Sequence, residues 1–150
     1  MKQKIEITVK NNQLTEENRE NTTSKINSRE TGYFYRKNKF YYLVYNDHSE
    51  GLDGARTIVR IDPEIEEILL MRKSPAKMKQ TFISGQKTEG IYETQYGKLN
   101  IKNRTNHLDF NISEKKGKII INYDLYINGK LSNKNKLKIL YREIETDNEK

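Results

Sequence analysis

The sequence contains no cysteine, no tryptophan, two prolines and two histidines in 150 residues. Without cysteine the chain can form no disulfide, carries no thiolate nucleophile, and offers no ligands for a zinc ribbon or an iron–sulfur cluster. Because such a chain does not need an oxidising compartment, the composition favours the reducing cytoplasm.

Long apolar runs are also missing. Residues 1–12 alternate between charged and apolar side chains and lack the continuous apolar core of a signal peptide. No later run approaches the length of a membrane span. We therefore expect a cytoplasmic protein that does not enter a membrane. The length is typical of one domain, so we expect a single domain over residues 1–150.

Apolar residues recur at every second position along most of the chain, and no stripe with the 3.6-residue period of a helix is sustained. Ile5, Ile7 and Val9, for example, alternate with polar neighbours, which is typical of a strand with one buried face. This pattern predicts an all-β fold. Strands are expected over residues 4–10, 32–36, 40–45, 55–61, 66–73, 77–83, 89–95, 98–104, 107–113, 119–127 and 137–141.

Tight turns separate these runs. Asn128-Gly129 lies between two alternating segments and is the strongest hairpin signal in the chain, while Thr105-Asn106 predicts another turn. Residues 11–27 are polar and are expected to form a mobile loop or a weakly paired stretch, and residues 143–150 a disordered tail. Consecutive hairpins without crossover helices favour an antiparallel up-and-down barrel of about eight to ten strands.

The alternation also predicts which side chains fill the barrel. Tyr41 and Tyr45 are expected to point inward with Leu43, and Phe34 can join them. Inward tyrosines either fill a small barrel or line a cavity with their hydroxyls, and both arrangements fit the sequence. The predicted core consists of Ile5, Ile7, Val9, Leu43, Val59, Ile61, Phe82, Leu99, Ile101, Leu108, Phe110, Ile112, Ile119, Ile121, Tyr123, Leu125, Ile127, Leu137 and Ile139.

The net charge of +7 suggests an anionic partner. Lysine outnumbers arginine by 20 to 8 and isoleucine outnumbers valine by 17 to 3, as the codons of an AT-rich genome would favour. Residues 96–150 carry 12 basic and 7 acidic side chains, so +5 of the excess lies there. One alternative function is therefore an RNA-associated accessory protein that uses the basic C-terminal hairpins. The lysines expected to carry it are Lys116, Lys118, Lys136 and Lys138.

Several segments resemble the YwiB-like proteins, which are small uncharacterised bacterial proteins grouped as a domain of unknown function. The resemblance rests on residues 72–74, Phe82, Gly85, the segment 92–99, the tyrosine-rich segment 41–45, the turn 50–54 and the segment 123–129. It implies a calycin-like barrel, the lipocalin architecture, with no established activity and no catalytic residues. Ser74 stands where glycine is expected, and the Gly-x-Trp signature of secreted lipocalins is absent.

The barrel interior is the expected binding site. The hypothesis is non-enzymatic binding of a small molecule in the barrel mouth, by a monomer or homodimer and without a cofactor. The candidate ligand-binding residues are Arg72, Tyr92, Tyr123, Tyr41 and Tyr45. In the alternative interpretation these residues have a structural role: the tyrosines pack in the core and Arg72 forms an ion pair.

A third hypothesis is a barrel enzyme in which Arg72, a tyrosine and Glu93 orient an acidic substrate and move a proton. Tyr92 and Glu93 are adjacent, however, and adjacent strand residues point to opposite faces. No catalytic residue is therefore assigned. His48 lies in a polar turn whose oxygens could hold a cation, but a solvated turn explains it better, and His107 is expected on the surface. No metal site is predicted.

Overall fold

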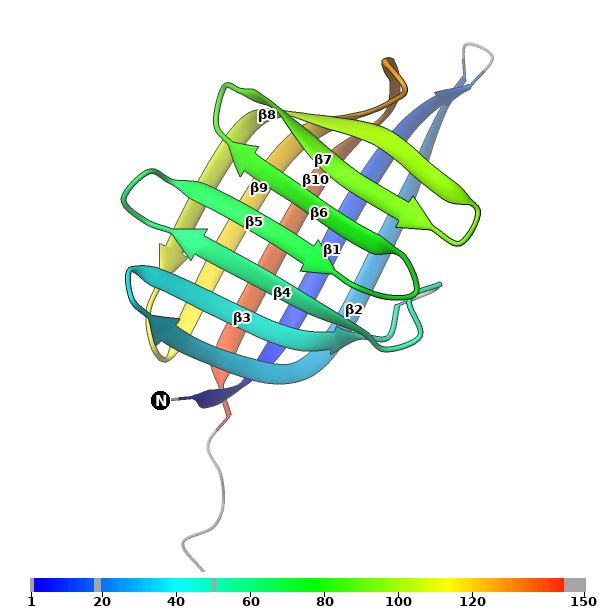
Figure 1. Cartoon of the computed structure of the whole chain (residues 1–150). Coiled ribbons are helices and arrows are strands. Elements are labelled where there is room, and N and C mark those ends of the chain that lie inside the picture. The colour runs from blue at the N-terminus through cyan, green and yellow to red at the C-terminus, as the bar shows by residue number, and fades with distance from the viewer. Residues whose placement is uncertain (1, 18–19, 50, 145–150) are drawn as a thin grey trace, which may run out of the picture.

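The computed structural model describes residues 2–17, 20–49 and 51–144. Its ten strands close into one antiparallel barrel in which each strand pairs with its sequence neighbours and β1 pairs with β10 (Figure 1). The strands are β1 Gln3–Glu17, β2 Glu20–Lys37, β3 Phe40–Asp47, β4 Ala55–Asp62, β5 Glu67–Arg72, β6 Lys77–Ile83, β7 Lys87–Thr94, β8 Gly97–Ile112, β9 Lys116–Ile127 and β10 Lys130–Glu143. The predicted all-β, up-and-down barrel is confirmed.

The barrel forms because one face of each strand is apolar. Ile5, Ile7 and Val9 of β1 point inward, and their partners on β10 are Glu143, Tyr141 and Ile139. Residues paired directly across an antiparallel sheet lie on the same face, so the apolar alternation of one strand sets that of the next. Closure leaves β1 and β10 paired with each other, where an open sheet would expose both as edges.

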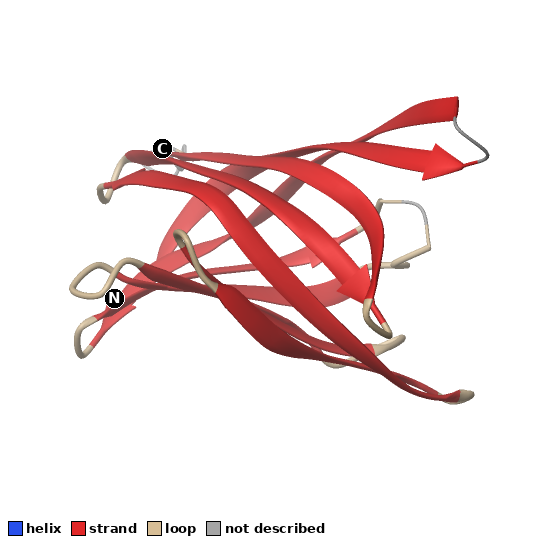
Figure 2. Ribbon diagram, turned by 90° about the horizontal axis from the view of Figure 1, so that it is seen from above, coloured by secondary structure: helices blue, strands red, loops and turns tan. Residues whose placement is uncertain are grey.

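The strands fall into a long and a short set. β1, β2, β8, β9 and β10 contain 12 to 18 residues, whereas β3 to β7 contain 6 to 8. Seen from above, all of them wrap around one interior, with turns at two opposite ends (Figure 2). β2 pairs with β3 only through residues 32–37, so the earlier part of β2 pairs with β1 alone. The two ends of the barrel therefore differ.

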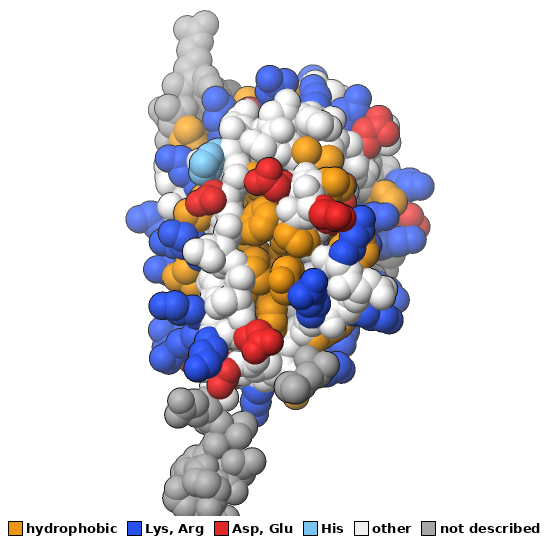
Figure 3. Space-filling model, turned by 90° about the vertical axis from the view of Figure 1, so that its left-hand side faces the viewer, with side chains coloured by type: hydrophobic (Ala, Val, Ile, Leu, Met, Phe, Trp, Pro, Cys, Tyr) orange, Lys and Arg blue, Asp and Glu red, His pale blue; other side chains and the backbone are white. Residues whose placement is uncertain are grey.

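Apolar side chains close one of these ends, the end with the turns after β2, β4, β6 and β8. Phe34 stacks on Tyr41 and on Tyr141, with ring centroids 5.8 and 5.3 Å apart. Half-buried Phe110 and Ile112 pack against the same core. Figure 3 looks at this end and shows apolar side chains gathered at its centre. The opposite end is open and holds the cavity described below.

The structure decides between two alternatives for residues 11–27 and corrects one strand boundary. These residues were expected to form a mobile loop or a weakly paired stretch, and residues 11–17 and 20–27 are paired: they belong to β1 and β2, with Asn11 opposite Ile26. Residues 18–19 lie outside the described residues. Glu143 ends β10 and does not begin the tail, of which residues 145–150 also lie outside the described part. The polar parts of β1 and β2 carry no apolar alternation that would predict a strand. They form strands because each pairs with a neighbouring strand.

The predicted turn at Thr105-Asn106 is instead a β-bulge within β8. Thr105 pairs with Tyr123 and His107 pairs with the adjacent Asn122, so that Asn106 is an extra residue. The bulge reverses the alternation: Ile101 and Thr105 point inward before it, and Leu108 points inward after it. The predicted strands 98–104 and 107–113 are therefore one strand.

The predicted core is largely confirmed, with differences at both ends of the barrel. Leu99 is 37% exposed, and Leu125 and Ile127 are half-buried, because the barrel is not filled there. Leu108, Phe110 and Ile112 are also only half-buried. The buried hydrophobic residues that the predicted core omitted are Phe34, Val44, Tyr45, Ala55, Ile68, Leu69, Leu70 and Tyr141. No helix in the described part of the chain is long and apolar enough to cross a membrane.

Gly117 on β9 makes room for Tyr141 on β10. The two residues are directly paired, and a Cβ atom on Gly117 would overlap the Tyr141 ring. The ring cannot easily move, because its hydroxyl donates to the Ser113 carbonyl at 2.6 Å and accepts from the Ser113 N–H at 3.1 Å. An aromatic ring laid over a glycine in this way stabilises the strand pair.

We expect Gly117→Ala to lower the free energy of unfolding by about 1–3 kcal/mol, the usual cost of overpacking. Urea denaturation followed by circular dichroism measures the loss. The double variant Gly117→Ala/Tyr141→Leu is the control, because removing the ring removes the clash, and alanine should then cost less than in the parent. An equal cost in both backgrounds would contradict the proposed contact.

Candidate functional site

A cavity of about 500 Å³ opens at the end of the barrel with the turns after β3, β5, β7 and β9. This volume lies within the range of sites that hold small organic ligands. Its apolar walls are Val9, Ile26, Leu52, Leu70, Met78, Leu99, Ile101, Leu125, Ile127 and Leu137. Its polar lining is Asn11, Gln13, Ser28, Asp47, Ser49, Arg72, Gln80, Tyr92, Tyr123, Ser132, Asn133 and Asn135.

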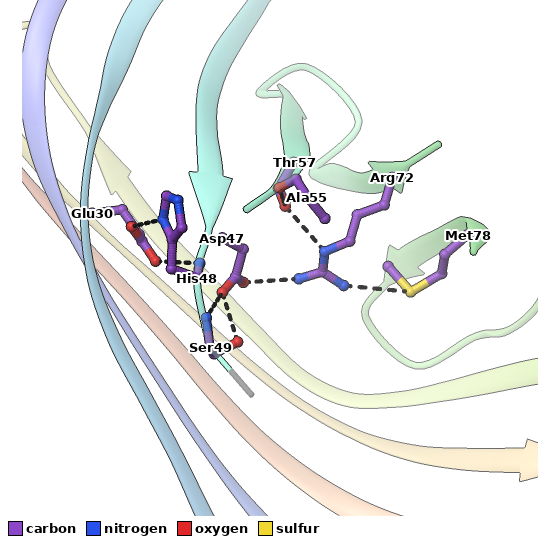
Figure 4. Close-up of polar contacts among 8 residues, drawn as sticks. All are labelled: Glu30, Asp47, His48, Ser49, Ala55, Thr57, Arg72 and Met78. Atoms are coloured by element: carbon purple, nitrogen blue, oxygen red, sulfur yellow. Dashed lines mark hydrogen bonds and ion pairs between the residues drawn. The ribbon is translucent and has the colours of Figure 1, made fainter. Parts of the chain in front are cut away.

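Arg72, at the end of β5, forms the main ion pair of the cavity. Its Nη2 lies 3.2 Å from Oδ2 of Asp47, and its Nε donates to Oγ1 of Thr57 at 3.0 Å (Figure 4). A third contact joins Nη1 to the Met78 sulfur at 3.7 Å. The Arg72 side chain is 16% exposed and that of Asp47 only 4%. The guanidinium is thus neutralised and oriented at the base of the open end.

A second carboxylate lies next to this pair. Glu30 points inward from β2, and its side chain is 8% exposed. It accepts hydrogen bonds from the His48 backbone N–H at 2.6 Å and pairs with His48 Nδ1 at 2.9 Å. This hydrogen bond and the charge of Glu30 raise the pKa of the exposed His48 imidazole. Asp47 accepts from the Ser49 N–H and hydroxyl at 2.9 and 2.6 Å, so both carboxylates secure the rim after β3 (Figure 4).

Carboxamide side chains line the opposite wall. Asn11 Nδ2 donates to Asn135 Oδ1 at 3.3 Å, and Asn135 Nδ2 donates to Asn133 Oδ1 at 2.6 Å. Across the barrel Gln80 Nε2 donates to Asn103 Oδ1 at 3.0 Å. Among the described residues, three buried side-chain atoms have no hydrogen-bond partner, namely Asn11 Oδ1, Asn103 Nδ2 and Thr105 Oγ1. A buried polar atom left unpaired is costly. Of these three residues Asn11 lines the cavity, whereas Asn103 and Thr105 do not, so Asn11 is the one that can offer an unused acceptor to another molecule.

The tyrosines divide between the two ends. Tyr92 and Tyr123 line the cavity together with Arg72. Burial raises the pKa of Tyr123 to about 12 against the opposing influence of Arg72 and Gln80, so its hydroxyl stays protonated. Burial also raises the pKa of Tyr45, which lies 3% exposed within the core. Tyr41 is at the closed end, beneath the Arg36 guanidinium at 5.4 Å, and does not line the cavity.

The expected Arg72, tyrosine and Glu93 arrangement is only partly assembled. Glu93 is exposed and belongs to the outer face of β7, opposite Lys77 of β6. The described contacts of Arg72 go to Asp47, Thr57 and Met78. Asp47 is the carboxylate that pairs with Arg72, and Glu30 pairs with His48; neither was predicted as a ligand-binding residue. No group of three or more His, Cys, Asp or Glu among the described residues is arranged to hold a metal ion.

The four candidate lysines lie on the outer surface, away from the cavity. Lys116 and Lys118 belong to β9, Lys136 and Lys138 belong to β10, and all four are exposed. Their positions alternate with inward residues such as Ile139, so they point away from the barrel interior. His107 is exposed on β8, as the alternation predicted.

These features define a class of protein: a closed, ten-stranded antiparallel barrel, plugged by apolar side chains at one end and open to a polar-lined cavity at the other. The chain belongs to the family described as Domain of unknown function (DUF1934), whose model matches residues 7–139. The YwiB-like resemblance is thereby confirmed.

Two comparisons extend this assignment. The chain is 31% identical over 142 residues to the "Uncharacterized beta-barrel protein YwiB" of Bacillus subtilis (strain 168), covering 94% of this chain and 96% of that protein. The crystal structure of the B. subtilis ywiB protein superposes with a TM-score of 0.80 at 28% identity, covering 96% of this chain and 94% of that one. The barrel architecture is therefore shared over nearly the whole length.

Proposed function

We propose that the barrel binds a neutral, amphipathic small molecule in its open end. The observation that carries the proposal is the lining of the cavity: it combines apolar walls with amide groups, and its formal charges cancel. The Arg72 and Asp47 side chains are the charged groups of the lining, and they are paired at 3.2 Å. An anionic ligand would have to compete with Asp47 for the guanidinium, and a cationic ligand with Arg72 for the carboxylate.

The apolar walls support a ligand with a hydrophobic body. Met78, Leu99 and Ile127 face the same space as Leu70 and Leu137. Removing apolar surface from water is favourable by roughly 25 cal/mol per Å², so an apolar body supplies most of the affinity in such a site.

The amide wall supports a ligand that also carries a hydrogen-bonding edge. Asn11 lines the cavity and its buried Oδ1 has no partner among the described residues, so it can accept from an N–H or O–H group. Asn133 and Asn135 lie beside it and are oriented by their mutual hydrogen bond. Pre-oriented polar groups of this kind give specificity at small cost in side-chain entropy.

Two dyes of nearly the same shape test the proposal. N-phenyl-naphthylamine is neutral, whereas anilinonaphthalenesulfonate adds a sulfonate to the same rings. Fluorescence titration should show saturable binding of the neutral dye at one site and at least about tenfold weaker binding of the sulfonate, about 1.4 kcal/mol. Absence of saturable binding by either dye would refute ligand binding in the cavity. Equal or tighter binding of the sulfonate would refute the preference for a neutral ligand.

A pair of leucine substitutions locates the dye. Leu99 lines the cavity and is 37% exposed, whereas Leu131 is 48% exposed and does not line it. Leu99→Trp should fill the open end and weaken binding of the neutral dye at least about tenfold, by about 1.4 kcal/mol. Leu131→Trp, the matched control, should leave it unchanged. Equal effects of the two substitutions would place the dye elsewhere.

A further inference from the structure

The outer surface of four adjacent strands is strongly basic. We call the outward side chains of β9, β10, β1 and β2 the basic face. Its exposed lysines and arginines are Lys116, Lys118, Lys134, Lys136, Lys138, Arg142, Lys4, Lys10, Lys25, Arg29 and Lys37. Against these eleven, the described acidic side chains on the same face are Glu6 and Asp124, both half-buried. Lysine and arginine line the left-hand edge of Figure 3, which corresponds to the back of Figure 1.

Like charges lie directly opposite each other on this face. Lys10 of β1 is paired with Lys138 of β10, and one step along, Asn12 separates Lys25 of β2 from Lys136 of β10. Like charges facing each other across a sheet destabilise it. The ion pair found here among the described residues joins Arg142 to Glu6 at 3.1 Å. Genomic preference for lysine can explain many lysines, but not their collection on one face with so little compensation.

The geometry of the sheet gives these charges a regular spacing. Lys134, Lys136 and Lys138 form one row along β10, where alternate residues are about 6.8 Å apart, twice the rise of an antiparallel strand. Neighbouring rows lie about 4.8 Å apart across the sheet. Such a surface presents a two-dimensional array of cations and suits a partner with closely repeated phosphates.

Neutral polar residues separate the cations. Thr8, Asn12, Asn27 and Asn122 occupy outward positions on the same four strands. Hydroxyl and amide groups are common contacts to phosphate and sugar oxygens of nucleic acids. A membrane partner would instead require a cluster of projecting apolar side chains. On this face Ile120 and Leu140 are half-buried among the lysines, and Leu14, 37% exposed, lies toward the end of β1.

The aromatic rings of the basic face lie at its edges, away from its lysine-rich centre. Tyr33, 45% exposed, and half-buried Tyr35 point outward from β2 on the side next to β3. Tyr126 lies at the edge of the face, half-buried, with the Lys87 ammonium 4.1 Å from its ring centroid. Single-stranded nucleic acids are held largely by bases stacked on exposed rings, whereas double-stranded RNA is recognised by its shape, its phosphates and its 2′-hydroxyls across a wide, shallow minor groove. We propose that the basic face binds double-stranded RNA through its backbone.

Fluorescence anisotropy with an RNA duplex of about 16 base pairs, the span of known duplex-binding domains, tests this proposal. The variant Lys136→Glu/Lys138→Glu reverses two neighbouring charges on the basic face. Lys77→Glu/Lys79→Glu on β6 is the matched control, since it reverses two exposed lysines in the same alternate arrangement outside the basic face. Both variants therefore carry the same net charge.

We expect the first variant to bind the duplex at least about tenfold more weakly than the parent, by about 1.4 kcal/mol, and the control to bind like the parent. The slope of log affinity against log salt should become shallower by about two in the first variant alone, about one for each phosphate that a lysine no longer neutralises. Equal losses of affinity in both variants would show that net charge alone drives binding and would overturn the proposal.

Three other probes are compared with the RNA duplex: a DNA duplex of the same sequence, single-stranded oligouridine, and vesicles containing anionic lipid. Weaker binding of all three than of the RNA duplex supports recognition of duplex RNA. Equal or tighter binding of any one of them, or affinity for the RNA duplex that does not fall with salt, overturns it. None of these outcomes depends on ligand binding in the cavity, because the basic face lies on the outside of the barrel.

Discussion

Phe82→Ala is expected to lower the free energy of unfolding by about 3–5 kcal/mol, the range for a large aromatic residue deleted from a core. Phe82 is fully buried near the end of β6, and its ring centroid lies 4.7 Å from that of Tyr123. The substitution removes the apolar surface of the ring and leaves a hole that rigid strands on all sides cannot close. Urea denaturation monitored by circular dichroism measures the loss.

Phe40→Ala is the matched control for this prediction. Phe40 is half-buried at the start of β3, where the Arg60 guanidinium lies 4.4 Å from its ring centroid. Because this phenylalanine is less buried than Phe82, its removal should cost clearly less. Similar losses for the two variants would mean that the interior of the barrel is not the main source of stability.

Since Tyr123 also lines the cavity, Phe82→Ala should in addition change the affinity for the neutral dye.

Arg72→Met is expected to cost about 2–3 kcal/mol. The substitution leaves the 4% exposed Asp47 carboxylate without its cation, and breaking a buried pair from one side costs about 3–5 kcal/mol. We take a lower value because the Arg72 side chain is 16% exposed and because Ser49 still donates two hydrogen bonds to Asp47. Denaturation in urea at neutral pH gives the difference.

A double variant separates the cost of an unpaired charge from the value of the ion pair. In Arg72→Met/Asp47→Leu both charges are absent, and replacement of a buried pair by apolar residues is often neutral. We therefore expect the double variant to be more stable than Arg72→Met alone. An additive loss, with the double variant less stable than either single one, would show that the pair itself stabilises the barrel.

The fold could be predicted from the sequence because the alternation is strong where a strand has one buried face. Ile119, Ile121 and Tyr123 of β9 are a clear case, and their burial was predicted correctly. The bulge at Asn106 was not recognised, because Thr105-Asn106 also suits a turn. The alternation of apolar residues does change phase there, between Ile101 and Leu108. This phase change is the signal that distinguishes one bulged strand from two strands.

The candidate site was predicted only in part. Arg72, Tyr92 and Tyr123 do line one cavity, since each lies at an inward position near the open end. Glu30 and Asp47 were missed for a physical reason. Glu30 lies between the polar segment, which ends at Asn27, and the strand predicted from residue 32, so no alternation predicted that it faces inward. Asp47 precedes a turn, where an exposed aspartate is common. Tyr41 was assigned to the site because alternation predicts an inward face but not which end of the barrel a residue occupies.

The pairing of β1 with β10 also has a consequence for the order in which the barrel assembles. Ile5 lies opposite Glu143, so this seam joins segments that are separated by almost the whole described chain, whereas every other strand pair is a local hairpin. Bringing distant segments together costs loop-closure entropy, and this cost arises before the new contacts can stabilise the pair. During synthesis on the ribosome, β1 can pair with β2 as soon as β2 has emerged, but β10 is made last. Until then Ile5, Ile7 and Val9 lack their partners on β10. Closure of the seam is therefore expected to be the late, slow step of folding, and the growing chain is most prone to aggregation before it.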